Sequence, residues 1–278
     1  TNHGYEFKPR NPQPPLLPEA NPVGVYRRDI EIPASWDNRD IYLHIGGAKS
    51  GLYVYLNGKE VGYSEDSKNP AEFLINKYLQ PGKNVLTLKI FRWSTGSYLE
   101  CQDFWRMSGI ERDVYLYSQP KVAIKDFRVT STLDDTYKNG IFKLTMDIRN
   151  TGSQTSKDYI IGYKVFDPKT NKVIAESEKN SAFNANSTVS LFGHTEIEIP
   201  DVKTWTSEHP NLYKLLMYIK DGEKIVEMVP FNVGFRRIEI KPIEQKAANG
   251  QPYVCLFING QPLKLKGVNI HEHNPATG

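Results

Sequence analysis

Short runs in which apolar and polar residues alternate recur along most of the chain. The strongest alternation covers residues 84–91 and 114–117, and a partial one covers residues 25–32. Successive side chains of a strand point to opposite faces, so a period of two predicts β-strands with one buried face. Strands that recur about every 8–12 residues, with few helical stretches between them, are typical of β-sandwiches and jelly rolls.

Turn-forming residues separate these runs and indicate where hairpins are expected. Asn57-Gly58 and Asn259-Gly260 each stand between two apolar runs. Both residue types tolerate positive φ, which a tight type I′ hairpin turn requires at its two central positions. Residues 1–22 are instead rich in proline. Proline fixes φ and lacks an N–H, so this segment is predicted to be an extended surface arm.

The distribution of these runs divides the chain into three segments. Residues 1–119, which end before Pro120, are predicted to be a jelly-roll sandwich. Residues 120–234 carry a second series, and about 115 residues with roughly seven short strands suit an immunoglobulin-like sandwich. The strands expected in that series are residues 125–131, 142–149, 160–166, 190–199, 215–219 and 224–229. Residues 235–278 read as a hairpin followed by a strand at 263–269, a piece too short for a sizeable core of its own.

Charge and composition exclude two classes of partner. The 278 residues hold 35 Lys and Arg against 32 Asp and Glu, spread along the chain without a basic block. Nucleic acid is therefore not an expected partner. No stretch reaches the roughly 18 apolar residues that a membrane span requires, so no span is predicted. The two cysteines, Cys101 and Cys255, are too few for a disulfide framework and are interpreted as free thiols.

The two ends of the chain look like cuts within a longer protein. The chain begins at Thr1 without a methionine, and it ends just after the strand-like run at residues 263–269. A leader segment in the longer protein would not be visible here, so the compartment, cytoplasmic or periplasmic, stays open.

The densest polar and aromatic cluster covers residues 92–110, between two expected strands. It contains Trp93, Trp105, Glu100 and Asp103 together with arginines. Sugar sites use such a mixture, because carboxylates and amides hydrogen-bond to hydroxyls while aromatic rings cover the C–H face of the sugar. A buried aromatic plug with a structural Arg–Asp pair explains the same composition, so composition leaves both interpretations open.

His271-Glu272-His273 is the second cluster that could carry chemistry. A His-x-His pair can bind a metal ion, but a third ligand is absent nearby and the spacing is not that of a zinc-protease helix. An exposed loop without a ligand is a second interpretation. The third is the carboxyl end of the first strand of a (β/α)₈ barrel, the face on which active-site residues gather.

Several longer blocks stand out along the whole chain. They are residues 56–67, 92–94, 96–100, 102–110, 112–114, 205–213, 233–236, 259–263 and 267–273. Each block alone is a weak indication. Taken together and in this order, they resemble the large β-galactosidases of glycoside hydrolase family 2, and the resemblance covers essentially all of the chain.

The resemblance implies a sugar-binding jelly roll, an immunoglobulin-like domain and, in residues 235–278, the first strands of a catalytic (β/α)₈ barrel. In this family the barrel supplies two glutamates for a retaining mechanism, with Mg²⁺ beside the acid. Those positions lie beyond Gly278, so the chain by itself is predicted to be inactive. The parent protein is expected to hydrolyse terminal β-D-galactosides such as lactose, and to be a homo-oligomer.

The resemblance also assigns roles to individual residues at the mouth of the site. Asn2 matches an asparagine that contacts the sugar. Asp103 matches an aspartate that binds a sugar hydroxyl and Na⁺, in line with the preference of hard cations for oxygen ligands. His271 matches a histidine that stabilises the transition state through a galactosyl hydroxyl. The family residue before Gln102 is usually acidic, and Cys101 in its place makes this loop less anionic.

Two other functions remain open at this point. The aromatic loop between Trp93 and Trp105 would also suit a self-sufficient carbohydrate-binding or adhesion module. Another family 2 activity, that of a β-glucuronidase or a β-mannosidase, is the second alternative. The Gly96-Ser97-Tyr98-Leu99-Glu100 and His271-Glu272-His273 patterns favour a β-galactosidase.

Overall fold

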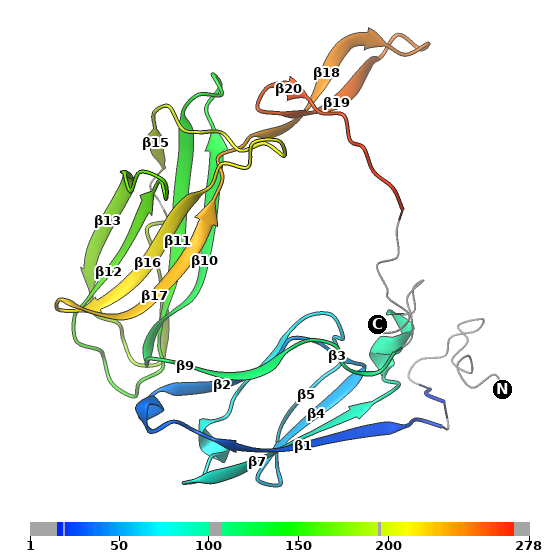
Figure 1. Cartoon of the computed structure of the whole chain (residues 1–278), viewed down its shortest axis with the longest axis vertical. Helices are drawn as coiled ribbons and strands as arrows, with labels where there is room; N and C mark the ends of the chain where they lie inside the picture. The colour runs from blue at the N-terminus through cyan, green and yellow to red at the C-terminus, as the bar shows by residue number, and fades with distance from the viewer. Residues whose placement is uncertain (1–15, 19, 101–106, 194–195, 270–278) are drawn as a thin grey trace. The chain divides into compact units, whose positions relative to one another are not determined.

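The computed structural model is almost entirely β, which confirms the predicted fold class. It describes residues 16–18, 20–100, 107–193 and 196–269. The chain divides into two compact units, Thr1–Lys121 and Val122–Gly278 (Figure 1). The helical elements in the described ranges are single 3₁₀ turns, η1 (Ala34–Trp36), η2 (Asn76–Tyr78) and η3 (Thr95–Tyr98).

The first unit is a sandwich of two antiparallel sheets. One sheet has the order β1 (Val23–Glu31), β7 (Lys83–Phe91), β4 (Gly51–Leu56), β5 (Lys59–Ser64). The other has the order β6 (Ala71–Leu74), β2 (Asp40–Ile45), β9 (Val114–Gln119), and β3 (Ala48–Lys49) pairs with β8 (Gly109–Ile110). Leu43 of one sheet and Val54 and Leu88 of the other belong to one buried cluster, so the facing surfaces form the core.

Alternation and turn chemistry produce this sandwich as the sequence predicted. Along β7 the residues Asn84, Leu86, Leu88 and Ile90 are buried, while their neighbours are more exposed. The buried Asn84 is fully engaged, since its Oδ1 accepts a hydrogen bond from Asn57 Nδ2 at 2.8 Å and its Nδ2 donates to two backbone carbonyls. Asn57 and Gly58 have φ of 53° and 78°, which confirms a hairpin turn that needs two positive φ values.

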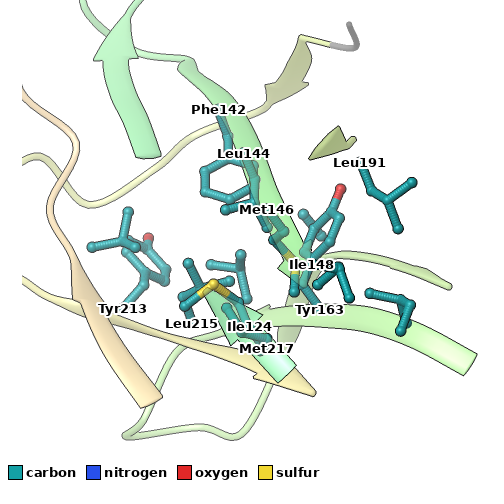
Figure 2. Close-up of a cluster of buried hydrophobic side chains, with 14 of the residues drawn as sticks. Ile124, Phe142, Leu144, Met146, Ile148, Tyr163, Leu191, Tyr213, Leu215 and Met217 are labelled. Carbon is teal, nitrogen blue, oxygen red and sulfur yellow. The ribbon is translucent and has the colours of Figure 1, made fainter. Parts of the chain in front are cut away.

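The second unit contains two further sheets that enclose a larger core. One sheet is built on β10 (Val122–Leu133), β11 (Gly140–Asn150) and β14 (Ser187–Leu191), with β15 (Ile197–Ile199) also paired to β11. The other has the order β13 (Val173–Ser181), β12 (Tyr159–Phe166), β16 (Tyr213–Asp221), β17 (Lys224–Val233). Figure 2 shows Phe142, Leu144 and Met146 of β11 directed toward Leu215 and Met217 of β16, and all five side chains are buried.

Two expectations for this unit were wrong in detail. Residues 190–199 were expected to be one strand, but they span the end of β14 and all of β15. Strand β13 was not predicted, because Glu176, Glu178 and Lys179 interrupt its apolar pattern. β13 lies at the edge of its sheet, where charged residues are tolerated and discourage further strand pairing.

A small three-stranded sheet follows in the second unit. It consists of β18 (Ile238–Lys246), β19 (Pro252–Ile258) and β20 (Gln261–Pro262), in antiparallel order. The expected hairpin is therefore confirmed, and Asn259 and Gly260 in the turn before β20 have φ of 48° and 76°. Residues 263–269 were expected to be a strand but have no regular structure. A strand is stable only when a neighbour pairs with it, and a barrel strand needs neighbours on both edges.

Candidate functional site

The three residues expected to touch a substrate, Asn2, Asp103 and His271, lie outside the described residues. Their roles, and the Na⁺ contact of Asp103, therefore stay predictions. The structure does describe the chain on either side of residues 101–106, which include Asp103. The contacts of these flanking residues show how the first unit holds the loop.

The carboxylate of Glu100 fixes the end of the chain that precedes residues 101–106. The backbone N–H of Ser67 donates to Glu100 Oε1 at 3.0 Å, and the Ser67 hydroxyl donates to Oε2 at 2.6 Å. Ser67 itself is buried. Hydrogen bonds to an ionised carboxylate are about twice as strong as those between neutral groups. Two of them therefore set both the position and the orientation of the Glu100 side chain.

The flank that follows residues 101–106 is tied to the same part of the unit. Strand β8 pairs with β3, so the chain is back in a sheet at Gly109. Arg112 Nη1 donates to the backbone oxygen of Lys68 at 2.6 Å. Lys68 is the neighbour of Ser67, which holds Glu100. Both flanks of the loop therefore converge on one short segment after β5.

A second carboxylate, that of Glu65, anchors the 3₁₀ turn η3 just before Glu100. It accepts hydrogen bonds from the hydroxyls of Tyr63 and Thr95, and from the backbone N–H of Gly96 at 2.9 Å. Burial alone would raise the pKa of Glu65, but these hydrogen bonds outweigh it and lower the pKa below its usual range. The ionised form of Glu65 is thus the form that holds η3.

The 3₁₀ turn η3 closes on itself and on the sandwich. The Ser94 backbone N–H donates to Ser97 Oγ at 3.0 Å, as one half of a capping box. Ser97 Oγ donates in turn to Ser50 Oγ at 3.2 Å, next to β4. These bonds connect η3 to the central strands of the first sheet, so the position of η3 is set by the sandwich rather than by local preference.

The last part of the proline-rich arm contacts Trp93, shortly before η3. Asn21 and Trp93 form a reciprocal pair: Asn21 Nδ2 donates to the Trp93 carbonyl at 3.0 Å, and the Trp93 N–H donates to Asn21 Oδ1 at 2.9 Å. An asparagine side chain placed in this way mimics a backbone partner in a sheet. The chain that leads from the arm into β1 therefore runs beside Trp93.

Trp93 does not provide an open face for a sugar. Its side chain is only 8% exposed. The Arg92 guanidinium lies over the ring, 5.1 Å from its centre, in a cation–π contact. For Trp93 the interpretation as a buried aromatic plug is therefore right, and its use as a stacking platform is ruled out. Trp105 lies outside the described residues.

Sequence reasoning missed the residues that position the loop, namely Glu65, Ser67 and Asn21. Glu65 and Ser67 belong to the block at residues 56–67 that carries part of the family resemblance. Their partners stand 30 to 33 residues further along the chain, at Thr95, Gly96 and Glu100. A sequence pattern without a fold gives no means of pairing them.

Metal binding is not tested by the part of the chain that the structure describes. No group of three or more His, Cys, Asp or Glu side chains there is placed to hold a metal ion. The Na⁺ expected at Asp103 and the Mg²⁺ expected beyond Gly278 concern other positions, and both stay predictions. No helix among the described residues is long and apolar enough to cross a membrane.

Two family models match the chain one after the other. Residues 2–120 match the sugar binding domain of glycosyl hydrolases family 2, and residues 122–236 match a second model of glycosyl hydrolases family 2. The chain belongs to glycosyl hydrolase family 2. This membership confirms the resemblance drawn from the sequence blocks.

Curated relatives of this chain are named β-galactosidases. The β-galactosidase of Priestia megaterium is 41% identical over 269 residues, which are 96% of this chain and 25% of the relative. That of Psychromonas ingrahamii is 35% identical over 282 residues, which cover 100% of this chain and 26% of the relative. This family 2 chain thus spans about a quarter of the length of these relatives.

Solved structures share the fold at lower identity. A Bacteroides uniformis β-glucuronidase has a TM-score of 0.80 and 20% identity, over 92% of this chain and 30% of its own. A putative β-galactosidase from Bacteroides fragilis has a TM-score of 0.75 and 18% identity, over 87% of this chain and 35% of its own. At such identities the likeness establishes the fold alone.

Proposed function

We propose that this chain is the non-catalytic front portion of a retaining β-galactosidase that hydrolyses terminal β-D-galactosides. The observation that carries the proposal is the similarity to β-galactosidases, at 35–41% identity, over nearly the whole chain. The β-glucuronidase likeness is weaker in sequence, at 20% identity. Among the activities of the family, β-galactoside hydrolysis is therefore the one best supported.

Under this proposal the chain supplies the rim of the site and the scaffold that positions it. Residues 1–119 form the sugar-binding domain, residues 120–234 the immunoglobulin-like domain, and residues 235–278 lead into the catalytic barrel. Asn2, Asp103 and His271 contact the galactosyl unit, and Asp103 also binds Na⁺. The acid and nucleophile glutamates, with Mg²⁺ beside the acid, come from beyond Gly278.

The part played by the described residues is to hold the loop that carries Asp103. Glu100, bonded to Ser67, and Glu65, bonded to η3, fix the chain before that loop. Preorganised side chains stabilise a transition state because they do not have to move during the reaction. A binding residue on a loop is preorganised only when the residues on both sides of the loop are held in place.

The experiment compares the 278-residue chain with the full-length protein on nitrophenyl β-galactoside. We expect turnover by the full-length protein and none above the blank by the chain alone, because both catalytic glutamates are absent from it. Nitrophenyl β-glucuronide serves as the matched control and is expected to be a much poorer substrate. Turnover by the chain at constant specific activity through purification, or preference for the glucuronide, would contradict the proposal.

Calorimetry with galactose or lactose distinguishes this proposal from an independent carbohydrate-binding module. We expect the 278-residue chain to bind more weakly than about 1 mM, equivalent to less than roughly 4 kcal/mol. Two reasons support this: Trp93 is buried, and most walls of the shared pocket belong to the rest of the protein. Binding tighter than that limit would favour the module.

A further inference from the structure

Four asparagines of the chain are followed directly by glycine, at positions 57, 139, 249 and 259. Asparagine is chemically labile, and glycine increases the lability because it has no side chain to keep its backbone nitrogen away from the preceding residue. When that nitrogen attacks the asparagine side-chain carbonyl carbon, a five-membered succinimide ring closes and ammonia leaves. Water then opens the ring to aspartate or isoaspartate. Ring closure therefore depends on how the fold holds the amide.

The amide of the asparagine between β4 and β5 is held at both ends. Asn57 Nδ2 donates to the Tyr78 carbonyl at 3.0 Å and to Asn84 Oδ1 at 2.8 Å. Its Oδ1 accepts from the Val85 N–H at 2.9 Å. To reach the nitrogen of Gly58, the side chain must give up all three partners, and two of these are backbone groups that would lose their own hydrogen bonds. The fold therefore protects this position.

Two further asparagines are held at both ends in the same manner. Asn139 Nδ2 donates to Glu198 Oε1 at 2.9 Å, and its Oδ1 accepts from the Asp201 N–H at 3.3 Å. Asn259 Oδ1 accepts from the Arg237 N–H at 2.9 Å, and its Nδ2 donates to a backbone carbonyl of the second unit at 3.1 Å. Each of these amides links segments that are distant in sequence, so neither can rotate without disturbing the fold around it.

Asn249 lies in a different setting, at the tip of the hairpin between β18 and β19. Residues 248–250 are all exposed. Within the part of the chain that the structure describes, the Asn249 side chain makes one hydrogen bond, in which its Oδ1 accepts from the Gln251 N–H at 3.1 Å. This bond lies within the tip itself. Rotation of the Asn249 amide therefore disturbs neither sandwich.

Ring closure at this tip requires only a local opening of the hairpin. The Gly250 N–H donates to the Ala247 carbonyl at 2.9 Å and must be released before the nitrogen can attack. The hairpin is irregularly paired next to the tip, where the register of β18 against β19 shifts between Pro242 and Lys246. Solvent-exposed hydrogen bonds with few apolar contacts open at little cost in free energy. A Cβ added to Gly250 would meet no atom within 4 Å, so the surrounding space is open as well.

We propose that Asn249 is a site of spontaneous succinimide formation and that the fold protects the other three Asn–Gly pairs. The reaction takes up water, releases ammonia and replaces a neutral amide by a carboxylate, which is ionised at neutral pH. Isoaspartate also adds one atom to the backbone of the hairpin tip. The inference does not depend on the proposed function, because it concerns only the chemistry of the backbone and of one side chain.

The test follows the four Asn–Gly pairs of the folded 278-residue chain during incubation at mildly alkaline pH, which favours the deprotonated backbone nitrogen. Proteolytic digestion and mass spectrometry measure aspartate and isoaspartate at each position. We expect conversion at Asn249 to be about tenfold faster or more than at positions 57, 139 and 259, because those side chains react only after larger openings of the fold. In concentrated urea the four rates should become similar, since the dipeptide is the same.

Asn249→Gln is the matched control. Its longer side chain would have to close a less favourable six-membered ring, so the acidic species seen by isoelectric focusing should be largely lost in this variant. A cooperative urea transition, measured by circular dichroism on the same sample, establishes that the incubated chain is folded. Equal rates at the four positions of the folded chain would overturn the inference. Acidic species that persist undiminished in Asn249→Gln would contradict it as well.

Discussion

At the scale of single residues, the candidate site depends on two carboxylates that never touch the substrate in our proposal. Glu65 and Glu100 each accept hydrogen bonds from groups far away in sequence, and together they hold the chain that leads into residues 101–106. Both carboxylates act by holding the backbone in position. Their substitution should therefore be visible first in the stability of the first unit.

Ser67→Ala removes the hydroxyl that donates to Glu100 Oε2 at 2.6 Å. Glu100 Oε2 then loses a hydrogen-bond donor next to the buried residue 67. We therefore expect the free energy of unfolding of the first unit to fall by about 1–3 kcal/mol. Urea denaturation of the 278-residue chain measures this. The exposed Ser35 of the same unit provides the control, since Ser35→Ala should change stability by no more than about 0.5 kcal/mol. Equal effects of the two variants would contradict the role of Ser67.

The lowered pKa of Glu65 predicts a dependence of stability on pH. Burial acts to raise this pKa, but hydrogen bonds from Thr95, Tyr63 and Gly96 lower it below the value in the unfolded chain. The folded state therefore binds fewer protons, and the contribution of Glu65 is present above about pH 4.3 and is lost as the pH falls through the folded-state pKa. The stability advantage of the wild type over Glu65→Gln should shrink over that range.

Denaturant unfolding of both forms at neutral pH and at several values below pH 5 checks this expectation. The sign is fixed by the direction of the shift, because a carboxylate with a lowered pKa stabilises the fold only while it is ionised. An advantage of the wild type that stays constant, or grows, as the pH falls would show that the hydrogen bonds to Glu65 do not favour its ionised form.

At the scale of elements, glycines inside strands mark places where neighbouring side chains cross the sheet. Gly162 of β12 lies opposite Tyr218 of β16 on one side and Glu178 of β13 on the other. The Tyr218 ring passes over Gly162 to donate its hydroxyl to Glu178 Oε1 at 2.7 Å. Glycine usually weakens a strand, but at this position the close approach of the Tyr218 ring requires it.

Gly162→Ala should destabilise the second unit for this reason. The added Cβ would lie 2.6 Å from the Tyr218 ring, so the ring must move and its hydrogen bond to Glu178 weakens. We expect a loss of about 1–3 kcal/mol, the usual result of overpacking. In urea unfolding, Gly267→Ala is the matched control, because no atom lies within 4 Å of its added Cβ. A Gly162→Ala chain as stable as this control would contradict the crossing of the ring.

At the scale of the whole molecule, the chain has two separate cores. The cluster that contains Leu52 belongs to the first unit, and the cluster that contains Leu144 belongs to the second. Each side chain is almost completely buried. The two cores share no member, so a cavity in one should leave the packing of the other unchanged.

Matched Leu52→Ala and Leu144→Ala substitutions test this independence by scanning calorimetry. Each should cost its own unit about 2–5 kcal/mol, the range for removing a buried leucine side chain. We expect each variant to lower the Tm of a different transition. Where the two transitions overlap in one broad peak, each variant should shift a different side of that peak. A single transition that shifts equally in both variants would show that the two units unfold as one.

Local physical chemistry accounts for the part of the structure that the sequence predicts well. The period of two along β7 and the turn at Asn57 and Gly58 involve only neighbouring residues. Both can therefore be predicted from the sequence alone. The same holds for the blocks that identify family 2, since they are contiguous. The predicted roles of Asp103 and His271 come from those blocks, and that of Asn2 comes from a separate match at the start of the proline-rich arm; all three stay predictions.

Only the tertiary structure decided how the candidate site is held. Asn21 pairs with Trp93 across 72 positions of sequence, and Ser67 meets Glu100 across 33. Such contacts exist because two sheets close on a shared core and bring distant loops together, and no local pattern encodes that closure. The same closure buries Trp93. The aromatic composition of this segment was therefore evident from the sequence alone, whereas its structural use at Trp93 followed only from the packing of the sandwich.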